Sequence, residues 1–97
     1  MSSTTEKTVH ILVSGRVQGV WYRGSTQKQA QQRQLRGWVR NLDDGSVEAL
    51  VSGSADKVDD LVAWMRQGPA GARVDDLQII NTSVAHADLP DGFEVRR

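Results

Sequence analysis

The sequence predicts an α+β domain in which two helices cover one face of an antiparallel sheet. Three observations support this fold class. Four stretches have the β-branched content of strands, two have the composition or apolar spacing of helices, and they follow one another as strand, helix, strand, strand, helix, strand. A chain of 97 residues is long enough for one modest core and too short for two.

The first part of the chain is predicted to form a strand and then a helix with a narrow apolar face. Residues 8–14 alternate, and the β-branched residues that share one face are Val9, Ile11 and Val13. The opposite face carries His10, which we expect on the sheet surface. Residues 24–34 are rich in glutamine, lysine and arginine, as a solvated helix would be. The inward positions, four residues apart, are Tyr22, Thr26 and Ala30.

The middle of the chain predicts a β-hairpin. Residues 35–42 form a strand, residues 43–46 form a turn of the Asp-Gly type, and residues 47–51 return as the antiparallel partner. Alternation along the first of these strands puts Asn41 on the same face as Val39. Asn41 should therefore point to the core side of the sheet.

A second helix and two strands complete the domain. Ser54 is a candidate N-cap, and the apolar residues that then recur at helical spacing are Val58, Leu61, Val62 and Met65. Residues 73–82 form the fourth strand, with a bulge or an irregular start expected at Asp75 and Asp76. Residues 92–95 form a short closing strand. The complete order is that of the split βαβ, ferredoxin-like sandwich.

Charge and cysteine content exclude several classes of function. The 12 basic and 12 acidic residues cancel, so no net field would attract nucleic acid or anionic lipid. The absence of cysteine removes thiol nucleophiles, zinc ribbons and disulfides, and it suits a reducing cytoplasm. The sequence also lacks a signal peptide and an apolar membrane span. We therefore expect a cytoplasmic protein with a disordered tail over residues 1–6 and a single domain over residues 7–97.

The segment between the first strand and the first helix predicts an oxyanion site. Gly15 and Gly19 can adopt positive φ, so the loop can bring several backbone amides to one point. The helix that begins near Tyr22 directs its unpaired first-turn amides there, and Arg23 adds a guanidinium. A cation at a helix N-terminus opposes the macrodipole, and a bound anion would remove that penalty. The alternative for the loop alone is an ordinary strand-to-helix turn with a surface arginine.

Two segments together resemble the paired signature of the acylphosphatase family. They are residues 15–23, GRVQGVWYR, and residues 37–48, GWVRNLDDGSVE. The resemblance extends over nearly the whole chain and implies hydrolysis of the carboxyl-phosphate bond of acyl phosphates to a carboxylate and inorganic phosphate. By similarity, Arg23 is the catalytic residue that binds the phosphate, and Asn41 orients the attacking water. The expected phosphate-binding residues are consecutive: Gln18, Gly19, Val20, Trp21, Tyr22 and Arg23.

The implied chemistry fits a site with few groups. Phosphoryl transfer through a loose transition state depends mainly on positioning and charge stabilisation. A carboxylate leaving group has a low pKa and needs no general acid, whereas an alkoxide leaving from a phosphate ester would need one, and the sequence supplies no evident acid. Asn41 can hold a water molecule but is not a base, so the proton could pass to the phosphate oxygens of the substrate. We expect no cofactor and no metal.

Other functions use the same fold. A non-catalytic module that binds phosphate or an acyl phosphate would need the same loop. A fragment of a larger carbamoyl-phosphate-handling protein is disfavoured because the chain begins and ends with complete elements. An RNA-recognition module is disfavoured because residues 9–13 and 47–51 contain no aromatic residue. The expected partners are therefore a small acyl phosphate and phosphate, with no nucleic acid and no membrane, and we expect a monomer.

Three positions depart from the pattern of the family. Tyr22 stands where phenylalanine is commoner, Trp21 occupies a variable position, and Leu42 replaces a polar residue found in some members. We expect these differences to affect the rim of the site, and hence affinity, rather than the reaction.

Overall fold

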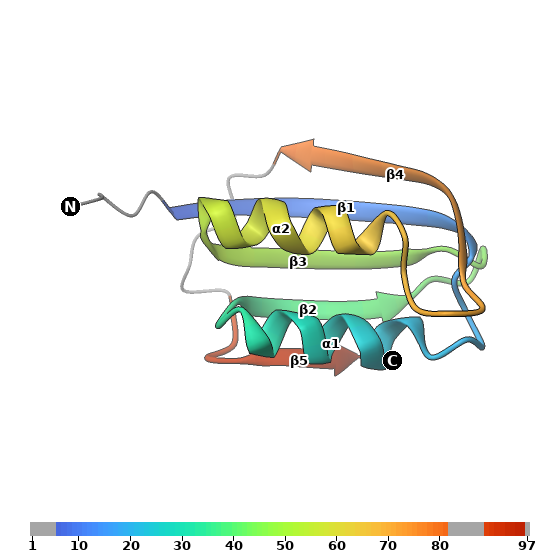
Figure 1. The fold of residues 1–97 in the computed structure, drawn as a ribbon, viewed down its shortest axis with the longest axis horizontal. Coiled ribbons are helices and arrows are strands. Elements are labelled where there is room, and N and C mark those ends of the chain that lie inside the picture. Colours follow the sequence, from blue (N-terminus) through green and yellow to red (C-terminus); the bar gives the residue numbers. More distant parts are fainter. Residues whose placement is uncertain (1–5, 82–88, 97) are drawn as a thin grey trace.

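The computed structural model describes residues 6–81 and 89–96, and these residues form a sheet with two helices packed on it (Figure 1). The elements in chain order are β1 (Glu6–Arg16), α1 (Tyr22–Gln32), β2 (Arg36–Asn41), β3 (Val47–Ser54), α2 (Ala55–Met65), β4 (Arg73–Asn81) and β5 (Phe93–Arg96). The predicted ferredoxin-like α+β fold is confirmed. The main difference in length is β1, which begins before and ends after its predicted bounds.

The five strands are ordered β4-β1-β3-β2-β5 in one sheet. Strands β1 to β4 pair antiparallel, as predicted. Strand β5 pairs parallel with β2, so the complete sheet is mixed rather than antiparallel. The short closing strand thus extends the sheet at its β2 edge and leaves β4 at the opposite edge.

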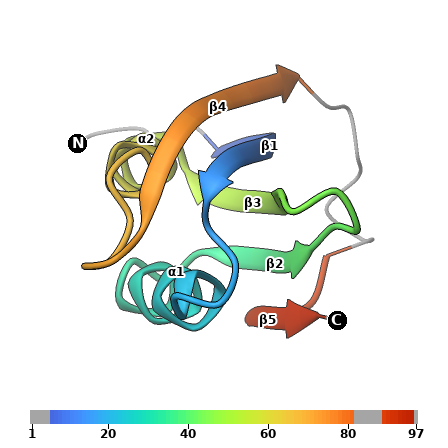
Figure 2. The same ribbon diagram turned by 90° about the vertical axis from the view of Figure 1, so that its right-hand side faces the viewer.

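Both helices lie on the same face of the sheet, with α1 over β2 and β5 and α2 over β1 and β3 (Figure 2). The alternation in β1 accounts for this arrangement, since Val9, Ile11 and Val13 are each no more than 2% exposed beneath the helices. Helix α2 buries the four apolar residues that its spacing predicted. Helix α1 buries the small set Tyr22, Ser25, Thr26 and Ala30, so it lies close to the strands that carry the site.

The predicted irregularity at the paired aspartates is present. Strands β1 and β4 shift register between Ser14 and Gly15, which leaves Asp75 as the extra residue of a bulge. Gly15 has φ 124°, and a Cβ there would lie 2.2 Å from the carbonyl oxygen of Arg73. Gly15 therefore permits the close approach of β4 rather than shaping the loop that follows β1.

Two predictions at the ends of elements need adjustment. Ser54 occupies the N-cap of α2, but its side chain makes no capping hydrogen bond. Glu6, predicted to belong to the tail, is the first residue of β1, while residues 1–5 and most of the connection before β5 lie outside the described residues. Within the described part of the chain, neither helix has the length and apolar character needed to cross a bilayer.

Candidate active site

A pocket of about 430 Å³ lies at the end of the sheet where β1 leads into α1 and where β2 and β5 end. Figure 1 shows these element ends at the same end of the sheet. Its lining residues are Val17, Gln18, Gly19, Trp21, Tyr22, Arg23, Gly24, Gln27, Asn41 and Val95. A second hollow, of about 660 Å³, shares three of these residues, Gln18, Arg23 and Asn41, and adds Leu42 and Asp43. The predicted oxyanion loop and the predicted water-binding amide therefore meet in one place.

The loop before α1 presents backbone amides to this pocket. Gly19 has φ 75°, and Trp21, the N-cap of α1, has φ 63° and makes no side-chain capping bond. In the part of the chain that the structure describes, no protein group accepts a hydrogen bond from the backbone amides of residues 18–22. The first turn of α1 also contains no acidic residue. Unpaired amides and the positive end of the helix dipole are thus available to an anion.

Gln18 links this loop to the β2–β3 hairpin. Its Nε2 donates to the carbonyl oxygens of Leu42 and Ser46, both at 2.8 Å. These two residues also pair with each other, because the Leu42 amide donates to the Ser46 carbonyl at 2.8 Å. The side chain of Gln18 therefore fixes the position of the hairpin relative to the loop, and only its backbone can contribute to an anion site.

The turn of the hairpin is held by its own acidic residue. The Asp44 carboxylate accepts hydrogen bonds from the hydroxyl group and the backbone amide of Ser46, and these bonds lower the pKa of Asp44. Gly45 has φ 94°, as an Asp-Gly turn requires. The predicted hairpin is confirmed, and its turn is built independently of any ligand.

Two predicted phosphate-binding residues direct their side chains into the protein. Tyr22 is 1% exposed, and its hydroxyl group donates to the Met65 carbonyl oxygen at 2.7 Å, which ties the start of α1 to the end of α2. Burial raises the pKa of the Tyr22 phenol, so the phenol stays neutral. Val20 is half-buried against the core. Tyr22 lines the pocket, so an anion there would be bound by its main chain, whereas Val20, also predicted to bind phosphate, lines neither hollow.

Arg23 extends from the first turn of α1 to the end of β5. Its Nη1 donates to the carbonyl oxygen of Arg96 at 2.9 Å, and the side chain lines both hollows. A guanidinium has five N–H donors, so this single bond leaves the group able to bind phosphate oxygens. The contact with β5 holds the cation at the pocket, where an anion would offset its unfavourable place at a helix N-terminus.

Asn41 is the last residue of β2 and lines both hollows. It lies two residues after Val39, which is fully buried, and the two residues share a face of the strand, as the alternation predicted. Its Oδ1 atom is buried and has no hydrogen-bond partner among the described residues. A buried acceptor without a protein partner is uncommon and is typical of a site that binds water or a ligand.

The structure also brings residues to the pocket that the sequence reasoning did not name, namely Val17, Gly24, Gln27 and Val95. Gln27 could have been found, because it follows Arg23 by four residues and so shares its helix face. Its Nε2 donates to the Phe93 carbonyl oxygen at 3.0 Å, a second link between α1 and β5. Across residues 6–81 and 89–96, no three histidine, aspartate or glutamate side chains are grouped as ligands for a metal ion.

Comparison with known proteins gives consistent matches. The family model described as Acylphosphatase matches residues 9–95. An acylphosphatase from Methylococcus capsulatus is 54% identical over 78 residues, which cover 80% of this chain and 85% of that protein. One from Haloquadratum walsbyi is 46% identical over 95 residues, covering 98% and 99%. The solved structure of an acylphosphatase from Coxiella burnetii aligns with a TM-score of 0.88 at 37% identity, covering 99% of this chain and all of that one.

Proposed function

The chain belongs to the acylphosphatase family, and we propose that it hydrolyses acyl phosphates to a carboxylate and inorganic phosphate. One observation carries the proposal for these residues: the unpaired amides of residues 18, 19, 21 and 22, the guanidinium of Arg23 and the buried Oδ1 of Asn41 belong to residues that line the same pocket. The first two bind an anion, and the third binds water. The relatives are named as acylphosphatases, which are hydrolases, and the match covers most of their length. This favours the proposal over a non-catalytic phosphate-binding module.

In the proposed reaction the loop and Arg23 bind the phosphoryl oxygens, and Asn41 holds a water molecule in line with phosphorus. The water oxygen attacks phosphorus as the bond between phosphorus and the acyl oxygen breaks, and the carboxylate leaves with the electron pair. The proton of the water passes to a phosphate oxygen, since Asn41 is not a base. Each preorganised donor on the phosphoryl oxygens typically contributes on the order of 10²-fold to the rate, or about 3 kcal/mol.

The substrate class follows from the groups that the pocket contains. A carboxylate leaves without protonation, whereas the alkoxide of a phosphate ester needs a general acid. Among the residues that line the two hollows, the ionisable acids are Asp43 and the buried phenol of Tyr22. The phenol already donates to the Met65 carbonyl, so it does not serve a leaving group in the pocket. We therefore propose mixed anhydrides rather than esters as substrates.

We further propose that residues 7–97 act as a single domain and as a monomer, in the cytoplasm. Support for one domain comes from the family model, which spans residues 9–95. Support for the cytoplasm comes from the complete absence of cysteine from the sequence.

The test is the turnover of benzoyl phosphate by the purified protein in excess chelator. We expect activity to persist in chelator. Arg23→Ala should lower kcat/KM by at least about 10²-fold, and phosphate should inhibit this variant less than it inhibits the wild-type protein. Asn41→Ala should lower kcat with a smaller change in KM, because water placement belongs to the transition state. Arg66→Ala, which removes an exposed arginine just after α2, is the matched control. Loss of turnover in chelator, or near wild-type activity of Arg23→Ala, would contradict the proposal.

A further inference from the structure

We infer that the acyl group of the substrate binds between Trp21 and Val95, so that this protein prefers aromatic and other apolar acyl phosphates over acetyl phosphate. This inference rests on the proposed function and adds a substrate class to it. It depends on three features of the pocket: where apolar surface is exposed, how Trp21 is held, and on which side of the phosphate site the two residues lie.

Part of the exposed apolar surface lies at the pocket. Among the described residues, four large apolar side chains are exposed, and they are Trp21, Ile79, Ile80 and Val95. Trp21, at 71% exposure, and Val95, at 37%, both line the pocket that contains Arg23 and Asn41. The other two are on β4, at the opposite edge of the sheet. Apolar side chains beside an anion site can bind a ligand that has an apolar end and an anionic end.

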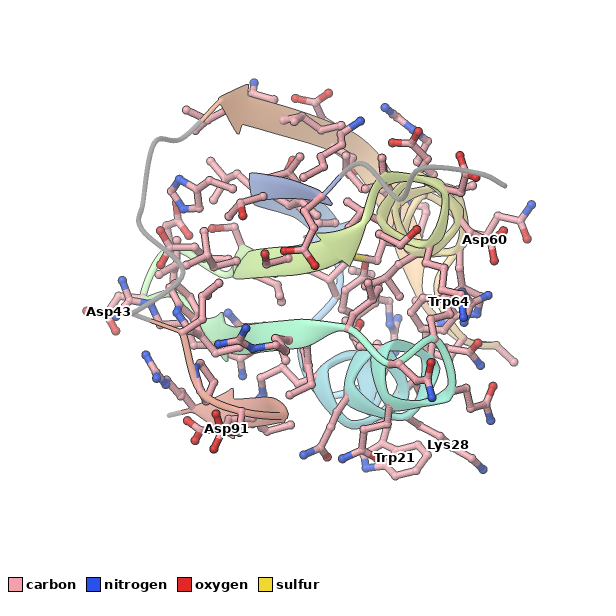
Figure 3. All side chains as sticks on the ribbon, turned by 90° about the vertical axis from the view of Figure 1, so that its left-hand side faces the viewer. Trp21, Lys28, Asp43, Asp60, Trp64 and Asp91 are labelled. Atoms are coloured by element: carbon pink, nitrogen blue, oxygen red, sulfur yellow. The ribbon has the colours of Figure 1, made fainter. Side chains whose placement is uncertain are left out.

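Trp21 is held in a defined position. Its φ of 63° is uncommon for a bulky residue, and backbone conformations of this kind persist mainly at functional sites. Its indole lies against Gly24, because a Cβ on Gly24 would come within 2.5 Å of the indole Nε1. Any side chain at residue 24 would displace the ring. Gly24, in the first turn of α1, thus leaves space for the exposed indole of Trp21 to pack against the helix. Figure 3 shows this ring standing out beyond α1.

Val95 reaches the pocket through the parallel pairing of β5. It is the register partner of Val39, whose side chain is fully buried on the helix-covered face. Side chains alternate along a strand, so Val95 lies on the same face as Val39 and Asn41. Its apolar surface therefore faces the pocket from the sheet.

The two hollows indicate how an acyl phosphate is oriented. They share Gln18, Arg23 and Asn41, so the phosphoryl group lies where the hollows meet. In an in-line displacement, the attacking and leaving oxygens lie on opposite sides of phosphorus. One hollow continues to Trp21 and Val95, and the other continues to Leu42 and Asp43.

Trp21 and Asp43 lie on different sides of the molecule, Trp21 beyond α1 and Asp43 at the turn between β2 and β3 (Figure 3). The apolar side suits a leaving aromatic carboxylate. The side with the exposed Asp43 carboxylate suits water and would repel an anionic leaving group.

The experiment compares kcat/KM for benzoyl phosphate with kcat/KM for acetyl phosphate, as a ratio. Trp21→Asn removes the ring and keeps a residue that tolerates the left-handed conformation, and Val95→Thr keeps the β-branched shape while adding a hydroxyl group. We expect the ratio to fall about tenfold in Trp21→Asn, at the low end of the effect of an apolar pocket contact, and to fall by less than that in Val95→Thr. Ile80→Thr, an exposed β-branched residue on the far edge, is the matched control and should keep the wild-type ratio.

A binding measurement separates the failure of this inference from the failure of the proposed function. Titration calorimetry with benzoylphosphonate and acetylphosphonate, which contain no hydrolysable anhydride, gives the same preference without turnover. If both acyl phosphates are hydrolysed but the ratio is unchanged in Trp21→Asn and Val95→Thr, the inference is wrong and the proposed function stands. If neither acyl phosphate is hydrolysed, the proposed function fails. A preference for benzoylphosphonate over acetylphosphonate that Trp21→Asn abolishes would still support the acyl-group site. Equal affinities of the wild-type protein for the two phosphonates would overturn that site.

Discussion

Gln18→Met tests whether the loop and the hairpin must be held together for catalysis. Methionine matches glutamine in length but cannot donate, so the variant loses both 2.8 Å hydrogen bonds to the carbonyl oxygens of Leu42 and Ser46. Each carbonyl keeps a backbone donor, since the Leu42 amide donates to Ser46 at 2.8 Å and the Gly45 amide donates to Leu42 at 3.2 Å. The full desolvation penalty is therefore avoided. At about 1 kcal/mol for each bond, the free energy of unfolding should fall by about 2 kcal/mol.

The same substitution should lower the rate, because Asn41 directly precedes Leu42 in the hairpin. A displacement of about 1 Å in a reacting geometry can reduce the rate about 10²-fold. We expect kcat for benzoyl phosphate to fall between about tenfold and hundredfold, with KM changing less. Urea unfolding followed by tryptophan fluorescence gives the stability, and the turnover assay gives the two kinetic constants.

The control and the refuting result are well defined. Gln78→Met removes one exposed hydrogen bond, from Nε2 to Asp76 at 3.0 Å, on the outer strand β4, and should change neither stability nor rate. If Gln18→Met lost less than about 0.5 kcal/mol and kept the wild-type kcat, the two bonds would not position the hairpin. If it lost stability alone, Gln18 would support the fold without positioning Asn41.

Two further predictions concern stability. Tyr22→Phe deletes the buried 2.7 Å bond to the Met65 carbonyl and should lower the free energy of unfolding by about 1 to 2 kcal/mol in urea; an unchanged value would show that the bond has no net effect. For Glu48, burial raises the pKa, but hydrogen bonds from Arg40 and His10 and their charges outweigh it and lower the pKa below the ordinary 4.5. The ionised carboxylate therefore stabilises the fold above that pH, and the contribution is lost as the pH falls through the lowered pKa. The difference in unfolding free energy between wild type and Glu48→Gln should shrink in acid, and a difference independent of pH would contradict this.

Local patterns in the sequence predicted much of the fold and part of the site. Alternation with a period of two put Asn41 beside Val39 in β2, and the structure confirms the shared face. The turn at Asp44 and Gly45 follows from residues that favour those backbone angles in any context. The glycine-containing loop before Arg23 was predicted for the same reason. These features depend on residues within a few positions of one another.

The remaining features of the site depend on contacts between residues far apart in the chain. Gln18 reaches carbonyls 24 and 28 residues away, Tyr22 reaches a carbonyl 43 residues away, and Arg23 reaches one 73 residues away. The parallel pairing of β2 with β5, which brings Val95 to the pocket, also joins segments far apart in the chain. Local patterns are enough to predict which elements form and which side chains share a face, because each element has its own period. Which element ends meet at the pocket depends instead on how the helices and the fifth strand pack on the sheet, and no local period records that packing.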